Sequence, residues 1–342
     1  MAFEISVIVC AHNPRRAYLQ RVLDALRDQT LRLEQWELLL IDNACREPLA
    51  LSWDLSWHSN AAHVREDELG LTPARLRGIS EARGEILVFV DDDNVLSSNY
   101  LENALEIARQ WPLLGVWGGT IKGEFEVQPE PCVEPLLGYL CLREFSKPIW
   151  SNNAEDWRAQ PSGAGLCSRA VVGKFYAEQL TREPLRRRLG RIGQSLSSGE
   201  DSDLIQTSCD LGFGFGNFPQ LILTHLIPKS RVQPDYLIRL LREITVSRVL
   251  LWYYRSGQLP DGPNRLKTWA GFFLSWLTED RYRALTYKAS QDAVRAAIQI
   301  AAAMPAHMKH QKHQESVAAG VKCGGLASPK DRSPKDAVPH SR

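Results

Sequence analysis

Three adjacent carboxylates, Asp91, Asp92 and Asp93, directly follow a short apolar run at residues 86–90. A run this short and rich in branched residues is typical of a strand buried on both faces of a sheet, and ligands bind at the carboxyl end of such a strand. Adjacent carboxylates repel one another unless a cation or a solvated turn relieves them, and their oxygens suit Mg²⁺ or Mn²⁺, which in turn bind diphosphate oxygens. A bare acidic triplet is more often a solvated turn, but its place after a strand favours a metal and diphosphate site.

A second acidic cluster, residues 199–204, precedes a helix-like segment. Acidic residues in the first turn of a helix interact favourably with its dipole, so helix capping alone explains Glu200 and Asp201. Beside a metal-binding turn, the same cluster offers a general base that takes a proton from a hydroxyl while the cation stabilises the leaving group. The residues by themselves leave both interpretations open.

The first hundred residues alternate short apolar runs with helical patterns. Apolar residues at positions 19, 22, 23 and 26 have the spacing of one face of an amphipathic helix. Thr72 as N-cap, followed by Pro73, predicts the start of a second helix, and Ser97 or Ser98 the start of a third. Strands are expected at residues 5–9, 37–41 and 86–90. Strands that alternate with helices predict an α/β fold with a mostly parallel sheet flanked by helices.

The composition is that of a soluble globular protein. Of 342 residues, 44% are hydrophobic and 24% charged, and 41 Lys and Arg against 40 Asp and Glu leave a net charge of +1. This composition argues against disorder over most of the chain and against a general nucleic-acid binder, because phosphate contacts would need a clear positive excess. We therefore expect no nucleic-acid partner.

The seven cysteines are scattered, with no C-x-x-C pair, so neither a disulfide framework nor a zinc ribbon is indicated and a reducing compartment is expected. The N-terminus shows neither the basic segment nor the cleavage site of a signal peptide, and no apolar stretch reaches the roughly 20 residues of a spanning helix. The sequence thus predicts a cytoplasmic protein, which would be peripheral at the cytoplasmic membrane face if its C-terminal helices rest on lipid.

The rest of the chain consists of segments with different sequence patterns. Residues 111–161 are irregular and dense in Gly and Pro, which predicts strands and long loops that form a substrate wall. Residues 236–254 and 266–304 have helical patterns, and the basic tail from residue 306 is expected to be disordered. We expect a catalytic domain over residues 1–232, a C-terminal helical region over 233–305 and a disordered tail over 306–342.

Two segments in the C-terminal half each admit two interpretations. The aromatic cluster Trp269, Phe272, Phe273 and Trp276, near Arg265 and Lys267, either packs on the catalytic domain or rests at a membrane interface, which would suit a lipid-linked acceptor. The basic run at residues 182–191 is either a loop near an anionic substrate or a solvated helix face. Packing and solvation are the commoner explanations.

Six motifs, in their order and spacing, resemble the start of the family 2 glycosyltransferases of GT-A fold. The resemblance covers about residues 4–232, and no single motif would carry it. The motifs are ISVIVCAHN at residues 5–13, LLIDN at 39–43, GLTPARLRG at 70–78, ARGE at 82–85 leading into FVDDD at 89–93, GAG at 163–165 with Ser168 and Arg169, and GED at 199–201.

The resemblance implies several groups of site residues. Those expected to contact the nucleotide sugar are Ala11, His12, Asn13, Asp42, Asn43, Arg75, Asp91, Asp92 and Arg231. Those expected on the acceptor side are Gly163, Ala164 and Gly165. The D-x-D pair, Asp91 and Asp93, is expected to hold Mn²⁺ or Mg²⁺ together with His225. Asp201 matches the catalytic base, with Glu200 beside it.

Two of these residues also have a chemical rationale. His225 lies in the strand-like run 221–226, where similar enzymes often place a histidine that faces the metal or the phosphates, although a lone histidine at a strand end is more often structural. The guanidinium of Arg231 could bridge two phosphate oxygens of a diphosphate.

Three departures from the family pattern limit the expectations. Asn43 stands where many relatives carry a second acid, and Gly165 where many carry asparagine, which leaves the nucleotide base and the acceptor contacts open. The Q-x-x-R-W motif of processive polysaccharide synthases is absent. Its absence favours the addition of one sugar per encounter.

The resemblance implies an inverting glycosyltransferase that moves a single sugar from a UDP, GDP or dTDP sugar to a hydroxyl of a glycan or lipid-linked acceptor, in the synthesis of cell-surface polysaccharide or a related glycoconjugate. Two alternatives stay open. A sugar nucleotidyltransferase should show a Gly-rich basic loop where this chain has CAHNP at residues 10–14, and a non-catalytic glycan- or nucleotide-binding descendant should have lost Asp91, Asp93 or Asp201. A dehydrogenase is disfavoured because no G-x-G-x-x-G follows the first strand.

Overall fold

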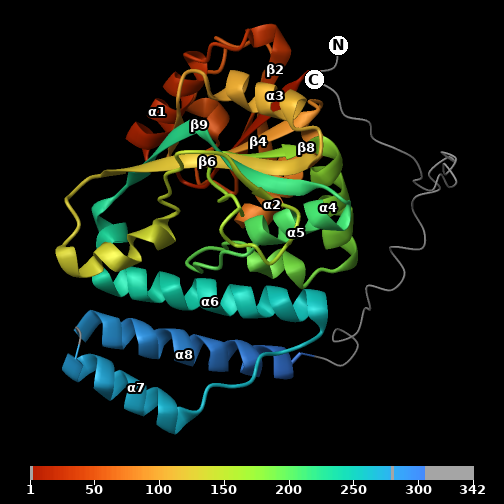
Figure 1. Cartoon of the computed structure of the whole chain (residues 1–342). Coiled ribbons are helices and arrows are strands. Elements are labelled where there is room, and N and C mark those ends of the chain that lie inside the picture. Colours follow the sequence, from red (N-terminus) through yellow and green to blue (C-terminus); the bar gives the residue numbers. More distant parts are fainter. Residues whose placement is uncertain (1–2, 279–280, 305–342) are drawn as a thin grey trace, which may run out of the picture.

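The computed structural model describes residues 3–278 and 281–304 (Figure 1). One twisted sheet with helices on both faces forms the upper part of the molecule in this view, and three long helices lie side by side below it. The sheet positions the site, because the polar residues singled out in the sequence follow its strands.

Four parallel strands form the N-terminal half of the sheet. Their order across the sheet is β3 (Ala61–Glu66), β2 (Trp36–Asn43), β1 (Ile5–Ala11) and β4 (Ile86–Asp91). Both β1 and β2 are buried along their whole length because helices cover both faces, which explains their continuous apolar sequences. The three strands predicted in this part of the chain are confirmed, each longer by one to three residues.

Successive side chains of a strand point to opposite faces of the sheet, so the core has two layers, one on each face. Val7 and Val9 of β1 belong to the layer that includes Leu19 of α1 (Arg16–Arg27) and Leu101 of α3 (Tyr100–Gln110). Ile8 faces the opposite layer, beneath α2 (Leu71–Glu81), α4 (Ala170–Arg182) and α5 (Glu200–Asp210). The predicted amphipathic helix is therefore α1, and its apolar face covers one side of the sheet.

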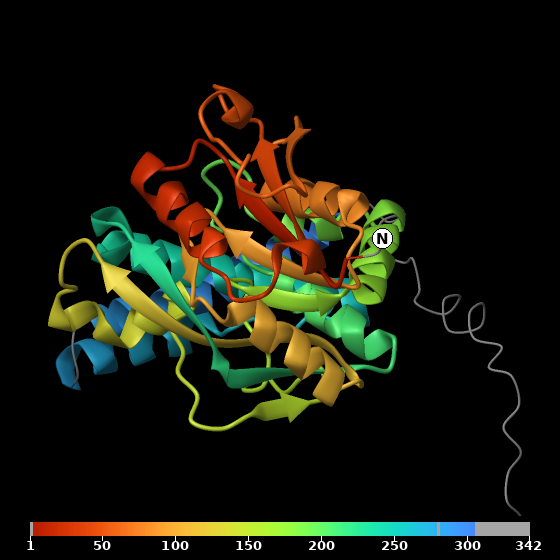
Figure 2. The ribbon, with the colours of Figure 1, turned by 90° about the horizontal axis from the view of Figure 1, so that it is seen from above.

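The C-terminal half of the sheet is mixed. β8 (Leu166–Arg169) lies between β4 and β6 (Leu114–Phe125) and is antiparallel to both. β9 (Gly214–Ile227) is parallel to β6, while the short strands β5 (Asn94–Leu96) and β7 (Ile149–Ser151) pair antiparallel with β9. The sheet twists so that the long strands β6 and β9 run at an angle to the red strands of the N-terminal half (Figure 2).

The α/β class is thus confirmed, but a mostly parallel sheet describes only the N-terminal half. A parallel strand needs a crossover, usually a helix, whereas β8 is entered from the irregular segment 126–165 without an α-helix before it. That segment holds β7 and the 3₁₀ helix η3 (Pro131–Leu140), in keeping with the strands and long loops predicted for residues 111–161.

Two predicted helix starts are wrong by one or two residues. Thr72 lies inside α2, whose N-cap is Gly70, and the N-cap of α3 is Asn99 rather than Ser97 or Ser98. Pro73 is tolerated within the first turn because the first amide groups of a helix have no partner in the helix. Gly70 fits its position because its φ of 146° is rarely adopted by residues with a side chain.

Three helices complete the described chain: α6 (Pro234–Ser256), α7 (Arg265–Thr278) and α8 (Arg281–Ala302). Leu237 and Leu240 of α6 pack against Val133 and Leu136 of η3, and α8 lies between α6 and α7 (Figure 1). None of the helices in residues 3–278 and 281–304 is long and apolar enough to cross a membrane. The tail predicted from residue 306 lies outside the described residues, and the division of the chain at residue 232 stays a prediction.

Candidate active site

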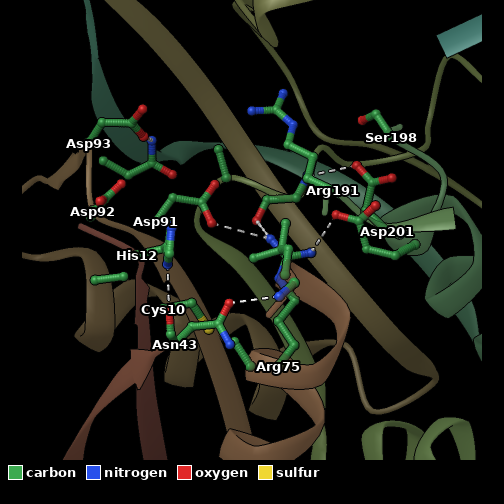
Figure 3. Close-up of a pocket in the computed structure, with 18 of the residues that line it drawn as sticks. Cys10, His12, Asn43, Arg75, Asp91, Asp92, Asp93, Arg191, Ser198 and Asp201 are labelled. Atoms are coloured by element: carbon green, nitrogen blue, oxygen red, sulfur yellow. Dashed lines mark hydrogen bonds and ion pairs between the residues drawn. The ribbon is translucent and has the colours of Figure 1, made fainter. Parts of the chain in front are cut away.

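A pocket with a volume of about 220 Å³ opens at the carboxyl ends of β1, β2 and β4 (Figure 3). Most of the residues expected at a site line it, although they come from distant parts of the chain. They are Ala11, His12, Asn43, Arg75, Asp91, Asp92, Asp93, Gly163, Ala164, Glu200, Asp201, His225 and Arg231. Three expected residues, Asn13, Asp42 and Gly165, are not part of the pocket wall.

The loop after β1 is held by hydrogen bonds of its own residues. The Nδ1 atom of His12 lies 2.6 Å from the carbonyl oxygen of Asn43, and its Nε2 lies 2.9 Å from Nδ2 of Asn13. Asn13 adopts a φ of 45°, which asparagine tolerates better than most residues, and its Oδ1 accepts the amide of Arg46. Asn13 therefore shapes the loop and orients His12, which itself faces the pocket.

Asp42, which was expected to contact the nucleotide, holds the loop after β2. Its carboxylate is buried and accepts hydrogen bonds from the backbone amides of Cys45 and Leu49, each at 3.0 Å, and from Arg65 at 2.7 Å. Burial alone would raise the pKa of Asp42, but these donors outweigh it and lower the pKa. Both carboxylate oxygens accept hydrogen bonds within the loop after β2, and a contact of Asp42 with the nucleotide stays a prediction.

Asn43, the next residue, does reach the pocket and also holds its rim. Its Oδ1 accepts the amide of Gly70 at 2.9 Å, and its Nδ2 donates to the carbonyl of Glu68 at 2.7 Å. These bonds fix the entry into α2, the helix that carries Arg75. An acid at this position could accept the Gly70 amide but could not donate to the Glu68 carbonyl.

Gly165 lies behind the pocket. Its φ is +67°, and its carbonyl accepts a hydrogen bond from the hydroxyl of Tyr100 at 2.6 Å. A β-carbon there would lie 2.6 Å from that hydroxyl oxygen, so the packing of α3 excludes a side chain. Gly165, which was expected on the acceptor side, therefore packs against α3 and does not line the pocket.

The acidic triplet forms one wall of the pocket, and its members differ. Asp93 lies 2.8 Å from Nη1 of Arg231 and 3.5 Å from Nε2 of His225. Burial would raise the pKa of Asp93, but the contacts with His225 and Arg231 outweigh burial and hold the pKa below the usual range. Burial and the charges of Asp93 and Asp91 raise the pKa of Asp92 to about 8. A cation at this wall would relieve that repulsion.

The residues present fit a divalent cation that a diphosphate helps to bind. Within the described residues, no group of three or more His, Cys, Asp or Glu side chains is assembled into a metal cage. Mg²⁺ commonly uses one or two carboxylates together with substrate phosphates, and Asp91 and Asp93 supply that number. The buried Oδ1 of Asn94, which also lines the pocket, has no hydrogen-bond partner and could serve as a further oxygen ligand.

His225 is held by the strands that carry it. It pairs with Asn94 in the register of β5 and β9, and its Nδ1 lies 3.0 Å from the carbonyl of Leu140. Its Nε2 lies 3.2 Å from Nη1 of Arg231 and 3.5 Å from the carboxylate of Asp93. His225 thus orients Arg231 and faces Asp93.

The opposite wall carries Asp201, and Gly163 connects it to Arg75. The Gly163 amide donates to Oδ2 of Asp201 at 3.0 Å, and the Gly163 carbonyl accepts from Nη2 of Arg75 at 3.2 Å. A β-carbon on Gly163 would lie 3.1 Å from the Arg75 guanidinium, which favours glycine there. Asp201 stands in the first turn of α5, where the helix dipole stabilises its negative charge.

Arg75 is the buried centre of the site, with 6% of its surface exposed. Its guanidinium lies 3.4 Å from both Asp91 and Glu200. Burial would lower the pKa of Arg75, but these two carboxylates outweigh it and raise the pKa. Burial, followed by the charge of Asp201, raises the pKa of Glu200 to about 7 against the effect of Arg75.

A second loop, between the 3₁₀ helix η4 (Arg186–Leu189) and α5, also lines the pocket, although none of its residues was named as a site residue from the sequence. Arg191 and Ser198 face the pocket from this loop (Figure 3). The guanidinium of Arg191 has no ion pair with any other described residue. The basic run at 182–191 was the only sequence signal, and it did not distinguish Arg191 from Arg186, which is buried against Asp203.

Comparison with known structures shows the GT-A glycosyltransferase fold. The mannosyltransferase PcManGT from Pyrobaculum calidifontis, solved with GDP-Man and Mn²⁺, superposes with a TM-score of 0.54 at 17% identity, over 87% of each chain. Residues 6–142 match the family model "Glycosyl transferase family 2". This part of the chain is therefore similar to the glycosyl transferase family 2 domain.

The curated relatives match a stretch of this chain slightly shorter than the one that the family model matches. EpsH of Bacillus subtilis is 26% identical over 106 residues, which is 30% of this chain and 30% of EpsH. The glycosyltransferase AglE of Haloferax volcanii is 26% identical over 104 residues, 30% of this chain and 34% of AglE. The minor teichoic acid biosynthesis protein GgaB of Bacillus subtilis is 24% identical over 30% of this chain and 12% of GgaB. The chain thus matches about a third or less of each relative's length.

Proposed function

We propose that this protein transfers a single sugar from a nucleotide-diphosphate sugar to an acceptor hydroxyl, with inversion at the anomeric carbon. The observation that carries the proposal is the pair of opposed walls in one pocket. The acidic triplet lies on one side and Asp201 on the other, and Arg75 and Gly163 connect them through contacts of 3.0–3.4 Å. A bound donor can therefore have its diphosphate at one wall and its anomeric carbon toward the other.

The donor side is formed by the ends of β1, β2 and β4. His12 and Asn43 lie at the end of the pocket proposed for the nucleoside, and Asp91 and Asp93 at the part proposed for the diphosphate. A divalent cation held by Asp93 and Asp91 would neutralise charge on the departing diphosphate when bound. The Mn²⁺ and GDP-Man in the PcManGT structure support a donor and cation of this class.

Two arginines are proposed to bind the phosphates. Arg231 is already oriented by Asp93 and His225, whereas the unpaired Arg191 enters from the opposite loop. A guanidinium can donate two hydrogen bonds to phosphate oxygens, and this interaction strengthens as negative charge develops on the leaving group. These side chains would thus favour departure of the nucleoside diphosphate.

Asp201 is the proposed general base. The Gly163 amide binds its Oδ2, and the Ser202 amide lies 2.7 Å from its Oδ1, so the carboxylate is fixed in orientation. It would take the proton of the acceptor hydroxyl as that oxygen attacks the anomeric carbon and the bond to the diphosphate breaks. Attack from the face opposite the leaving group inverts the configuration.

We propose a glycan or lipid-linked acceptor of cell-surface polysaccharide or related glycoconjugate synthesis, and a site of action at the cytoplasmic side of the membrane. The printed name of GgaB, a minor teichoic acid biosynthesis protein, supports a cell-surface product. The missing Q-x-x-R-W motif supports addition of one sugar at a time. The mass of the product after prolonged reaction tests this point, because a processive enzyme would add a series of sugars.

The experiment for the reaction compares Asp201→Asn with wild type. A panel of UDP-, GDP- and dTDP-linked hexoses is offered with Mn²⁺, and release of nucleoside diphosphate is followed. We expect Asp201→Asn to lower kcat by about 10²- to 10⁴-fold while donor affinity stays nearly unchanged. Asp235→Asn is the matched control, because Asp235 also lies in the first turn of a helix but is absent from the pocket wall. Near-normal turnover of Asp201→Asn would refute the assignment.

A further inference from the structure

The outermost helix of the molecule presents an apolar face to solvent. On α7, Leu266, Trp269, Phe273 and Trp276 are all more than half exposed, and their spacing of three and four residues places them on one side of the helix. In Figure 1, α7 lies at the lower edge of the molecule, and α8 separates it from α6. The catalytic domain therefore does not cover this face.

The opposite face of α7 already has its packing partner. Thr268 is 3% exposed, and its Oγ1 lies 3.2 Å from Nη1 of Arg295 on α8. A β-carbon on Gly271 would lie 2.7 Å from the Tyr287 ring, which shows close packing of the two helices there. The packed side of α7 thus carries Thr268, Gly271 and the half-buried Phe272, while the other aromatic residues of the helix are exposed. This is the reverse of an ordinary surface helix.

Basic groups flank the exposed aromatic face. Arg265 and Lys267 stand on either side of Leu266 at about 100° each around the helix axis, and the Nζ of Lys288 on α8 lies 4.8 Å from the centre of the Trp269 ring. The sequence of α7, from Arg265 to Thr278, contains neither Asp nor Glu. Aromatic and apolar residues between flanking cations are the pattern of a helix that lies in a membrane interface.

We infer that α7 docks in the headgroup region of an anionic lipid bilayer, with Trp269 and Phe273 inserted and the flanking cations on anionic headgroups. Tryptophan suits this region because its ring is apolar and its N–H is polar. The charge of α7 favours lipid over a second copy of the chain as the partner of this face. A symmetric contact between two copies would bring the same basic residues together, and neither α7 contains an acidic residue to pair with them. Docking is separable from the proposed transfer of sugar, since it needs neither donor nor turnover.

Co-sedimentation of the full chain with lipid vesicles tests this inference. Vesicles of phosphatidylcholine with about a third phosphatidylglycerol are compared with pure phosphatidylcholine, at low and high salt. We expect binding to the anionic vesicles that weakens with salt. The double variant Trp269→Ser/Phe273→Ser should lose about tenfold in affinity, because two apolar anchors are removed while every basic residue is kept.

Trp157→Ser is the matched control, since Trp157 is 65% exposed on a loop far from α7 in the sequence, and it should bind as wild type does. Thermal melting shows whether each variant is folded, and Phe273→Ser alone serves if the double variant is not. Equal binding of wild type and variant to anionic vesicles would overturn the inference. So would a dimer, seen by light scattering, that the same substitutions dissociate, because the face would then belong to a second copy.

Discussion

Arg75 and Glu200 lie 125 positions apart in the chain, yet the guanidinium of one is 3.4 Å from the carboxyl of the other inside the pocket wall. The same guanidinium lies 3.4 Å from Asp91, at the end of β4. One buried cation therefore connects the strand that presents the acidic triplet to the helix that presents Asp201. The spacing between the two walls of the pocket depends on this contact.

Replacement of Arg75 should damage stability and activity together. Arg75→Ala leaves the buried carboxylate of Glu200 and the partly exposed one of Asp91 without their cation, which should cost about 3–5 kcal/mol of unfolding free energy. Arg75→Lys keeps the charge but cannot reach Asp91, Glu200 and the Gly163 carbonyl at once, so we expect an intermediate melting temperature and little turnover. Arg77→Ala on the same helix is the control, because Arg77 is 44% exposed and pairs only with Glu81 at the surface. Equal melting of Arg75→Ala and Arg77→Ala would contradict the role of Arg75.

The raised pKa of Glu200 predicts a pH dependence of stability. The pKa is about 7 in the folded protein against 4.5 when unperturbed, so between these values the folded state binds more protons than the unfolded state. The free energy of unfolding should therefore fall as pH rises through this window, by on the order of 3 kcal/mol from this group. Urea unfolding at pH 5 and pH 8 measures the fall, and Glu200→Gln should reduce it. An identical fall in the variant would show that Glu200 is not its source.

Asp203 of α5 forms an ion pair with α6, and it should be needed both for the stability of the fold and for the rate of sugar transfer. Its fully buried carboxylate lies 2.9 Å from Arg186 and 3.0 Å from Arg255 of α6. Asp203→Asn leaves both arginines short of a counter-charge, at a cost of about 3–5 kcal/mol, and should also lower kcat because α5 begins with Glu200 and Asp201. Arg255→Gln should have a smaller effect, and Arg248→Gln, on an exposed site of α6, almost none. Unchanged melting of Asp203→Asn would rule out this function for the buried carboxylate.

Arg191 should contribute to phosphate binding. Arg191→Gln should weaken the affinity for a nucleoside diphosphate by about tenfold or more, the value of one hydrogen bond to a charged group, and leave the affinity for the parent nucleoside unchanged. Arg188→Gln, on the exposed side of the same basic run, should bind both as wild type does. Isothermal titration with the two ligands separates the contributions. Equal loss for nucleoside and diphosphate would point to a disturbed loop instead of a lost phosphate contact.

Local pattern predicted the strands and the two acidic clusters, while the family resemblance supplied most of the other residues of the pocket wall. Strands buried on both faces are visible as apolar runs, and the residues at their carboxyl ends must meet at one edge of the sheet. That is why the acidic triplet and Asn43 could be placed together from the sequence. The antiparallel insertion of β8 could not be predicted, because strand order in this half depends on contacts between distant segments.

Residues that look alike in the sequence have different partners in the structure. Asp42 and Asp91 both end a parallel strand, but the carboxylate of Asp42 is used by the amides of Cys45 and Leu49, which only the loop geometry reveals. Arg186 and Arg191 belong to one basic run, but one is buried against Asp203 and the other faces the pocket. Residue type and spacing identify candidates for a site, whereas the partners of each side chain decide its role.

The central claim is that the triplet wall binds a nucleoside diphosphate together with a divalent cation. Calorimetric titration of UDP, GDP and dTDP, with and without Mn²⁺, tests it in wild type and in Asp93→Ala, each shown to be folded by thermal melting. We expect one of the nucleotides to bind in a Mn²⁺-dependent manner, and Asp93→Ala to abolish that dependence. Failure of folded wild type to bind any of the three, with or without the metal, would contradict the claim and favour a non-catalytic descendant of the fold.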